Sequence, residues 1–438
     1  MSYNMEIIED DEHCPCGSGL KFVECCNLNI TNSPQSSINQ FKNDNHITSF
    51  IRKKYKESNI SLCLHPKHEE CVNEIIKAHS LQNNGILSKL EVNNHLMVIS
   101  HVSKIVKTRK KIKITEEYIN NLILNSSESF SKELKNELYK IGKKEIEKHY
   151  GMEFEGEVVQ PIIKYEVERK GKNEATIFTG FCKYHDSSVF SPIEDFDYNE
   201  EAQQDFLFAY RAFAEQYHEK LRAINEYKNI FKNDPGLYKN IKFILDYRYI
   251  QIDDGYMSRL KEKFDQAIIN EDYNILETVR IRLPKAYDFA VTAMIAPEID
   301  LEGNTLNDKY LLEENVCKSL YLTIFPTNVE TVILVSWLKE DSDHFKHYKN
   351  QILGLSRRKL KCYLNNLIPA YTPNIVLGPR LWEKQSESGK NKFLKSFEII
   401  GEEIENFKSA PAKLSEKRKK SLKSYNKFLK NTLYDLFK

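Results

Sequence analysis

Two groups of cysteines constrain this chain more than any other feature of its sequence. The tighter group places four thiols close together, at Cys14, Cys16, Cys25 and Cys26. Four sulfur ligands in tetrahedral array, with no open position, are typical of a structural zinc ion. A Gly-Ser-Gly segment separates the two pairs and allows the backbone to turn sharply, because glycine tolerates positive φ. We therefore predict a small zinc knuckle in this part of the chain.

The run from Cys14 to Cys26 resembles the SEC-C motif, the zinc-binding tail module of the SecA protein-export motor, which is also attached to many unrelated bacterial proteins. The motif reads C-x-C-G-S-G followed by a C-C or C-H pair, and this run matches it residue by residue. The resemblance implies that the four cysteines hold one zinc ion. It also implies contact with a partner protein or a ribosome. It does not extend to the motor, because the chain has no Walker A run.

Disulfide bonds are the alternative use of such cysteines. The chain begins Met-Ser-Tyr-Asn-Met-Glu, without the basic start and apolar segment of a secretory signal. No stretch approaches eighteen consecutive apolar residues, so no membrane span is predicted. We therefore expect a cytoplasmic protein, in which clustered thiols stay reduced and bind metal.

The second group of candidate ligands is split along the chain. Its first part runs from Cys63 to Cys71, and its second part is a C-x2-H pair, Cys182 and His185, more than a hundred residues later. Three thiols and an imidazole make another tetrahedral set for zinc. We predict a second zinc site formed by Cys63, Cys71, Cys182 and His185.

Two alternatives stay open for this second set. His65 and His68 lie between its first two cysteines and compete for one ligand position. In the other alternative, Cys182 is an ordinary buried thiol and the histidines are solvated.

Strand-like segments precede the C-x2-H pair. Residues 162–168 alternate in polarity, residues 170–173 have turn composition, and residues 175–181 are again strand-like, which predicts a β-hairpin. A knuckle on a loop and a second knuckle after a hairpin is the layout of treble-clef zinc sites.

The apolar run from Glu74 to Ser80 ends in a histidine and resembles the first strand of HNH nucleases. The resemblance implies that His79 deprotonates the attacking water, and that Asp186 helps to hold Mg²⁺ or Mn²⁺. Asn93 or Asn94 is placed to supply a bridging asparagine. A zinc ion with four ligands cannot activate water, so catalysis needs this separate cation.

The chain departs from the HNH pattern at two points. Ala78 stands where these nucleases carry an acidic residue, and the stretch between His79 and Cys182 is much longer than a compact ββα unit. A helix-rich insertion would account for that length. The alternative role for His79 is to support the zinc loop through its ring nitrogens.

The overall charge does not favour a polyanionic partner. The chain has 64 basic and 63 acidic residues and a net charge of +1, so no general field attracts nucleic acid. Basic residues do cluster at 104–113 and 413–427. We predict nucleic-acid contacts at Lys107, Arg109, Lys110 and Lys111 in the first run, with solvated helix faces as the alternative.

Length and pattern predict an α+β protein of several parts. The predicted parts are a zinc knuckle (1–27), a flexible linker (28–45) that leaves the knuckle as a tethered appendage, a treble-clef or HNH-like zinc domain with a helical insertion (46–198), a helical region (199–285) and a C-terminal α+β domain (286–438). The helices expected in the last two parts span 200–227, 254–270, 272–283, 341–355, 356–367 and 389–408. The strands expected there span 287–295, 320–326 and 331–337, the last two as a hairpin.

The function expected from these features is binding. Two zinc modules would organise a surface for nucleic acid or for a ribosome-associated or other protein partner. The alternative is an HNH-like, metal-dependent endonuclease, which the resemblance associates with bacterial anti-phage defence.

Overall fold

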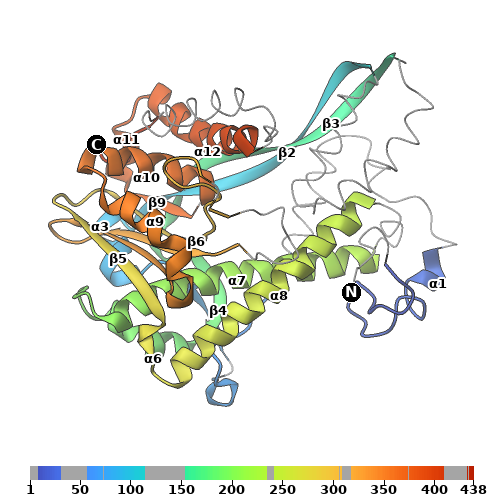
Figure 1. Ribbon diagram of the computed structural model, residues 1–438, viewed down its shortest axis with the longest axis horizontal. Coiled ribbons are helices and arrows are strands. Elements are labelled where there is room, and N and C mark those ends of the chain that lie inside the picture. The colour runs from blue at the N-terminus through green and yellow to red at the C-terminus, as the bar shows by residue number, and fades with distance from the viewer. Residues whose placement is uncertain are drawn as a thin grey trace.

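The chain folds into a mixed α+β architecture in which helices cover both faces of a large antiparallel sheet (Figure 1). The computed structural model describes residues 8–30, 57–72, 74–113, 153–233, 241–304, 306–307, 317–372, 374–408, 432 and 434–438. Within these ranges, no helix is long and apolar enough to cross a bilayer.

The large sheet has seven strands in the order β3-β2-β9-β6-β7-β8-β5. Its strands are β2 (His95–Lys113), β3 (Glu153–Gly171), β5 (Leu276–Leu283), β6 (Phe289–Ile295), β7 (Leu320–Pro326), β8 (Thr331–Leu338) and β9 (Ile375–Leu377). The predicted hairpin is confirmed, since β7 and β8 pair from Tyr321–Ser336 to Pro326–Thr331. Every residue of these two strands is buried, which explains why their sequences are continuously apolar.

The two faces of the sheet bury two separate cores. In β8, Val332 and Leu334 pack into one core, while Ile333 and Val335 pack into the other, as the two-residue period of a strand requires. The first core is covered by α6 (Lys183–Glu194), α7 (Ala202–Asn233) and α8 (Ile241–Ile269). The second is covered by α9 (Ser342–Leu353), α10 (Arg357–Tyr371), α11 (Pro379–Glu383) and α12 (Glu387–Lys408).

One helix predicted from the sequence is wrong. After the short 3₁₀ turn Tyr273–Ile275, residues 276–283 form the edge strand β5, which pairs with β8 along its whole length. The β-branched residues Thr278, Val279 and Ile281 favour a strand. Pairing with β8 supplies the backbone hydrogen bonds that decide the conformation.

The predicted hairpin between residues 162–168 and 175–181 is also wrong, although both segments are strands. β3 pairs with β2, and β4 (Ile177–Cys182) pairs with β1 (Ile75–His79) in a separate two-stranded sheet. The insertion between β1 and β4 is mainly strand in its described part, because β2 and β3 are each 19 residues long. Residues 114–152 lie outside the described part of the chain.

The β2–β3 pair forms a long arm. Its base joins the large sheet where Met97 and Val98 of β2 pair with β9. Its outer part continues past the sheet (Figure 1). The antiparallel register is unbroken from the His95–Gly171 pair to the Lys113–Glu153 pair.

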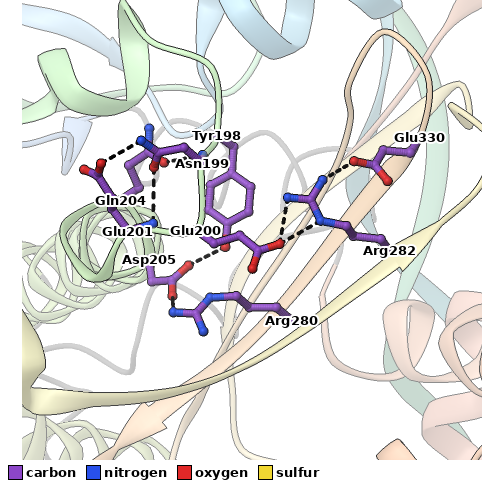
Figure 2. Close-up of polar contacts among 9 residues, drawn as sticks. All are labelled: Tyr198, Asn199, Glu200, Glu201, Gln204, Asp205, Arg280, Arg282 and Glu330. Atoms are coloured by element: carbon purple, nitrogen blue, oxygen red, sulfur yellow. Dashed lines mark hydrogen bonds and ion pairs between the residues drawn. The ribbon is translucent and has the colours of Figure 1, made fainter.

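A polar network fixes the start of α7 on the edge strand β5 (Figure 2). The Asp205 carboxylate is almost fully buried, accepts a hydrogen bond of 2.7 Å from the Tyr198 hydroxyl, and is paired with Arg280 of β5. Two positions along β5, Arg282 pairs with Glu200 at 2.7 Å. Because the carboxylate of Asp205 is buried with partners on both sides, the helix is held in one position against the sheet.

The cysteine-rich knuckle packs against the far end of the α7–α8 pair (Figure 1). Phe22 of the knuckle shares a small core with Phe231 of α7 and Tyr247 of α8, and Phe231 is fully buried there. The knuckle therefore does not stand apart as the tethered appendage expected from the sequence. Residues 31–56, which contain most of the predicted linker, lie outside the described residues.

Candidate metal centres and the histidine beside them

The first cysteine group forms a tight cluster. The four sulfur atoms of Cys14, Cys16, Cys25 and Cys26 lie within 4.8 Å of one another, with Cys16 to Cys25 at 3.6 Å and Cys25 to Cys26 at 3.9 Å. Sulfurs bound at about 2.3 Å to a common tetrahedral ion lie about 3.8 Å apart. The cluster therefore has the dimensions of a zinc site.

Local backbone geometry closes this cluster. Gly17 and Gly19 have φ values of +78° and +79°, which other residues rarely adopt, so the turn between the cysteine pairs depends on glycine. The Cys14 amide donates to the Leu20 carbonyl at 2.8 Å. The Ser18 hydroxyl donates to the Cys25 sulfur at 3.3 Å.

The second group is assembled from three segments. Cys63 and Cys71 flank the 3₁₀ turn His68–Glu70, Cys182 ends β4, and His185 lies in the first turn of α6. The antiparallel pairing of β1 with β4 places Ile75 opposite Cys182. A knuckle, two strands and a helix thus surround the four candidate ligands, although the two strands are distant in sequence.

The distances within this second group fit one ion. The Nδ1 atom of His185 lies 3.4 Å from the sulfur of Cys63, 3.5 Å from that of Cys71 and 3.3 Å from that of Cys182. Tetrahedral zinc with one nitrogen and one sulfur ligand requires a separation of about 3.6 Å. The structure therefore brings together the four residues that the sequence predicted.

The two competing histidines do not take a ligand position in this group. The ring of His65 stacks on that of His185, with centroids 3.8 Å apart, and burial lowers the pKa of His65 to about 3. His65 is therefore a neutral packing partner of the ligand. His68 begins the exposed 3₁₀ turn between the two cysteines.

His79 ends β1, paired with Ile177, whereas Ile75 at the start of the strand is paired with Cys182 of the second group. The Nδ1 atom of His79 lies 2.8 Å from the Ala175 carbonyl, and this bond requires the proton to be on Nδ1. Burial lowers the pKa of His79, so the ring is neutral near pH 7. The Nε2 lone pair is then the basic site of the side chain.

Asp186 does not stand beside His79 as a free carboxylate. Arg211 of α7, almost fully buried, pairs with Glu194 and lies 3.8 Å from Asp186. Burial raises the pKa of Asp186. The guanidinium thus lies between two carboxylates. In the described part of the chain, His79 belongs to no group of three metal-ligating side chains.

Behind His79 lies a second buried polar cluster. The Glu215 carboxyl group of α7 is bonded to Asn374, and the Asn374 amide donates to the Ser80 hydroxyl at 3.4 Å. Burial raises the pKa of Glu215 to about 8, so this carboxyl group is largely protonated at pH 7. The cluster links the end of β1 to α7 and to the segment before β9.

Asn93 and Asn94 have a structural role. Their φ values are +53° and +58°, and the Val92 and His95 amides each bond to the other's carbonyl at 3.1 Å. Two successive residues with positive φ make a type I′ turn, for which asparagine is suited. The pair starts β2, and the structure gives it no contact with His79.

Lys107, Arg109, Lys110 and Lys111 lie on β2 in the outer arm. The register pairs Arg109 with Glu157 and Lys111 with Glu155, whereas Lys107 and Lys110 are opposite Val159 and Gly156. The register therefore places an acidic residue directly opposite two of the four basic positions. The second basic run, 413–427, lies outside the described residues.

A third group with metal-ligating side chains, Asp300, Glu302 and His347, has a structural explanation. The Asp300 carboxylate accepts hydrogen bonds from the amides of Glu302 and Asn304 at 2.9 and 2.8 Å. It therefore organises its own loop.

Sequence reasoning missed the supporting residues of these sites. Glu70, whose carboxylate faces the Nε2 atom of His185, was identifiable as an acidic neighbour of Cys71. For Arg211 and Glu215 only the fold shows that the first is almost fully buried and the second half-buried. Asn374 lies far from Ser80 in the sequence, and no local pattern links them.

No protein-family model, no curated protein and no solved structure matches this chain, so the candidate sites rest on their own geometry.

Proposed function

We propose that this protein is a zinc-binding protein whose two metal centres organise a surface for nucleic acid. The observation that carries the proposal is the completeness of both ligand sets. Each group supplies four N/S ligands at tetrahedral spacing. A closed set leaves no position for substrate or water, so the metal acts by fixing the backbone around it.

The arm supports nucleic acid as the partner. A two-stranded antiparallel ribbon has the width to enter the major groove of DNA. The register places Lys107 and Lys110 opposite Val159 and Gly156, so no acidic residue stands at their directly paired positions. The SEC-C resemblance of the knuckle favours a protein or ribosomal partner instead, and the test below separates the two.

The test measures binding of labelled duplex DNA and single-stranded RNA by fluorescence anisotropy at two salt concentrations. We expect binding that weakens with salt, and weaker binding still in Lys107→Ala/Lys110→Ala. The matched control is Arg109→Ala/Lys111→Ala, whose positions face glutamates and which we expect to have the smaller effect. Failure to bind either nucleic acid, with recovery of a protein by affinity capture, would redirect the proposal to a protein partner.

An HNH-like nuclease is the second candidate, and His79 is the observation that favours it. His79 ends the first strand of a strand–strand–helix unit that carries the second group of candidate zinc ligands. Its Nδ1 atom is held by the Ala175 carbonyl, and the neutral ring offers Nε2 as a base. The pairing of Arg211 with Glu194 and Asp186 weighs against this candidate, because those carboxylates already have a cationic partner.

The nuclease hypothesis has its own test. If it holds, the protein cleaves DNA or RNA with Mg²⁺ or Mn²⁺, and His79→Ala abolishes cleavage while zinc content stays unchanged. His68→Ala, an exposed histidine beside the same centre, is the control. Equal cleavage by the His79 variant and the parent would exclude His79 as the base.

A further inference from the structure

One strongly basic cavity of the described residues has no ligand of either metal group in its lining. Its volume is about 560 Å³, within the range of small-molecule sites. The cationic side chains that line it are Lys89, Lys285, Arg380, Lys384 and Lys438. Asp288 is the one carboxylate side chain in the lining, so five cationic side chains and one acidic side chain line the cavity.

These cations come from separate parts of the chain. Lys89 lies in the short helix α3 (Ser88–Leu90), Lys285 follows β5, Lys384 follows α11, and Lys438 belongs to the segment packed against β6 and α10. Because these segments are distant in the sequence, the positive charge of the cavity arises only when the chain folds. A single lysine-rich stretch would not produce it.

Asp288 does not neutralise the cavity. Its carboxylate accepts a hydrogen bond of 3.1 Å from the Leu381 amide, and it lies 3.8 Å from Arg380. A Cβ atom at Gly378 would come within 2.2 Å of this carboxylate, so glycine is needed for the approach. Asp288 therefore caps the start of α11 and is shared with one arginine.

The four lysines form no close ion pair, although Lys384 attracts the Asp288 carboxylate at longer range. Across the described part of the chain, none of Lys89, Lys285, Lys384 and Lys438 has a carboxylate within 4.0 Å. Lys89 donates to the Gly85 carbonyl at 2.6 Å, and the Lys285 ammonium lies 5.1 Å from the centre of the Tyr287 ring.

A second cavity gives a direct comparison. It has a similar volume, about 600 Å³, and lies between the end of α8 and the end of β8. Its three cations, Arg259, Lys263 and Lys339, are balanced by the three carboxylates of Glu262, Asp272 and Glu340. A cavity of similar size in this protein therefore has balanced side-chain charges, whereas the first cavity does not.

We propose that the cavity lined by Lys89, Lys285, Arg380, Lys384 and Lys438 binds a phosphate-bearing anion of nucleotide size. A concave surface of one charge sign concentrates ligands of the opposite sign. Arginine and lysine donors form strong, charge-assisted hydrogen bonds to phosphate oxygens. A free nucleotide and the phosphorylated end of a nucleic-acid strand both present this chemistry. The site is independent of the surface organised by zinc.

The test uses the full-length, zinc-loaded protein and three probes: tripolyphosphate, ATP and a 5′-phosphorylated tetranucleotide. Isothermal titration calorimetry measures each Kd for the parent, for Lys285→Ala/Lys384→Ala and for the control Arg259→Ala/Lys339→Ala. We expect the first double variant to weaken binding about tenfold or more, and the control to leave it unchanged. All four substituted positions are exposed, and thermal melting with zinc analysis checks that each variant folds.

The outcomes separate the sources of the phosphate. Tighter binding of ATP than of the tetranucleotide assigns the cavity to a free nucleotide, and the reverse order assigns it to a strand end. Absence of binding by all three probes overturns the proposal. So does an equal loss in the two double variants. If Lys285→Ala/Lys384→Ala melts early, Lys384→Ala alone provides the same comparison at an exposed position.

Discussion

The Nε2 atom of His185 lies 3.7 Å from the Oε2 atom of Glu70, while the Nδ1 atom of the same ring faces three cysteine sulfurs. A carboxylate beside the second nitrogen of a ligating histidine fixes the tautomer and makes the ring a better ligand. Glu70 comes from the turn that links Cys63 to Cys71, so the segment that supplies two sulfurs also places a carboxylate close to the imidazole.

This relationship predicts the effect of Glu70→Ala. We expect zinc to bind the second centre about 10-fold to 100-fold more weakly, because the imidazole loses its orienting carboxylate. Competition with a chromophoric chelator measures the change. Glu69→Ala, the exposed neighbour on the same turn, should leave the affinity at the parent value. Equal affinities for both variants would show that Glu70 does not act on His185.

The metal content itself is the second prediction. We expect elemental analysis of the purified protein to return about two zinc ions per chain, from the two four-ligand groups. Cys14→Ser and Cys182→Ser should each remove one. Cys362→Ser, outside both groups, should keep both ions. A parent protein without zinc would contradict the assignment of both centres.

The buried carboxyl group of Glu215 predicts a dependence of stability on pH. Burial raises its pKa from 4.5 to about 8 in the fold, whereas the unfolded chain ionises near the lower value. Between these values unfolding releases a proton. The contribution of Glu215 to stability is therefore full below pH 4.5 and is lost as the pH rises through 8.

Glu215→Gln tests this directly, because glutamine mimics the neutral carboxyl group. Relative to the parent, the variant should become more stable between pH 5 and pH 8 by an amount on the order of 3 kcal/mol. Chemical denaturation across that range measures the difference. A constant difference between parent and variant would mean that Glu215 does not titrate there.

The network between α7 and β5 gives a further prediction. Arg280→Ala leaves the buried Asp205 carboxylate without its cation, which should cost about 3 kcal/mol of the free energy of unfolding. Arg282→Ala, two residues along the same strand, removes pairs with the more exposed Glu200 and Glu330 and should cost less than about 1 kcal/mol. An equal loss of unfolding free energy in the two variants would show that the burial of Asp205 does not decide the cost. Denaturant titration measures both.

The sequence predicted the elements with strong patterns. The apolar runs of β6, β7 and β8 and the aromatic stripe of α7 are long enough for their period to decide their conformation. The four ligands of each metal group were also predictable, because their cysteines and histidine occur in closely spaced pairs typical of zinc sites.

Strand pairing was not predictable in the same way. Residues 162–168 and 175–181 are separated by a turn-like segment, and local reasoning joined them. The partner of β3 is nevertheless β2, and that of β4 is β1, because each pairing buries apolar side chains that a local hairpin would leave outside the core. Likewise, residues 276–283 became a strand only because β8 was available beside them. Long-range contacts of this kind leave no local pattern.

The helix α7 connects features that the sequence separates widely. Its first half packs under the large sheet and beside the second metal group, and its last turns hold the knuckle through Phe231. Its 32 residues span about 48 Å at 1.5 Å per residue. This single continuous helix thus sets the distance between the two sulfur clusters. A partner that contacts both clusters must therefore match a fixed separation. Inserting a single residue into α7 would rotate one cluster by about 100° relative to the other.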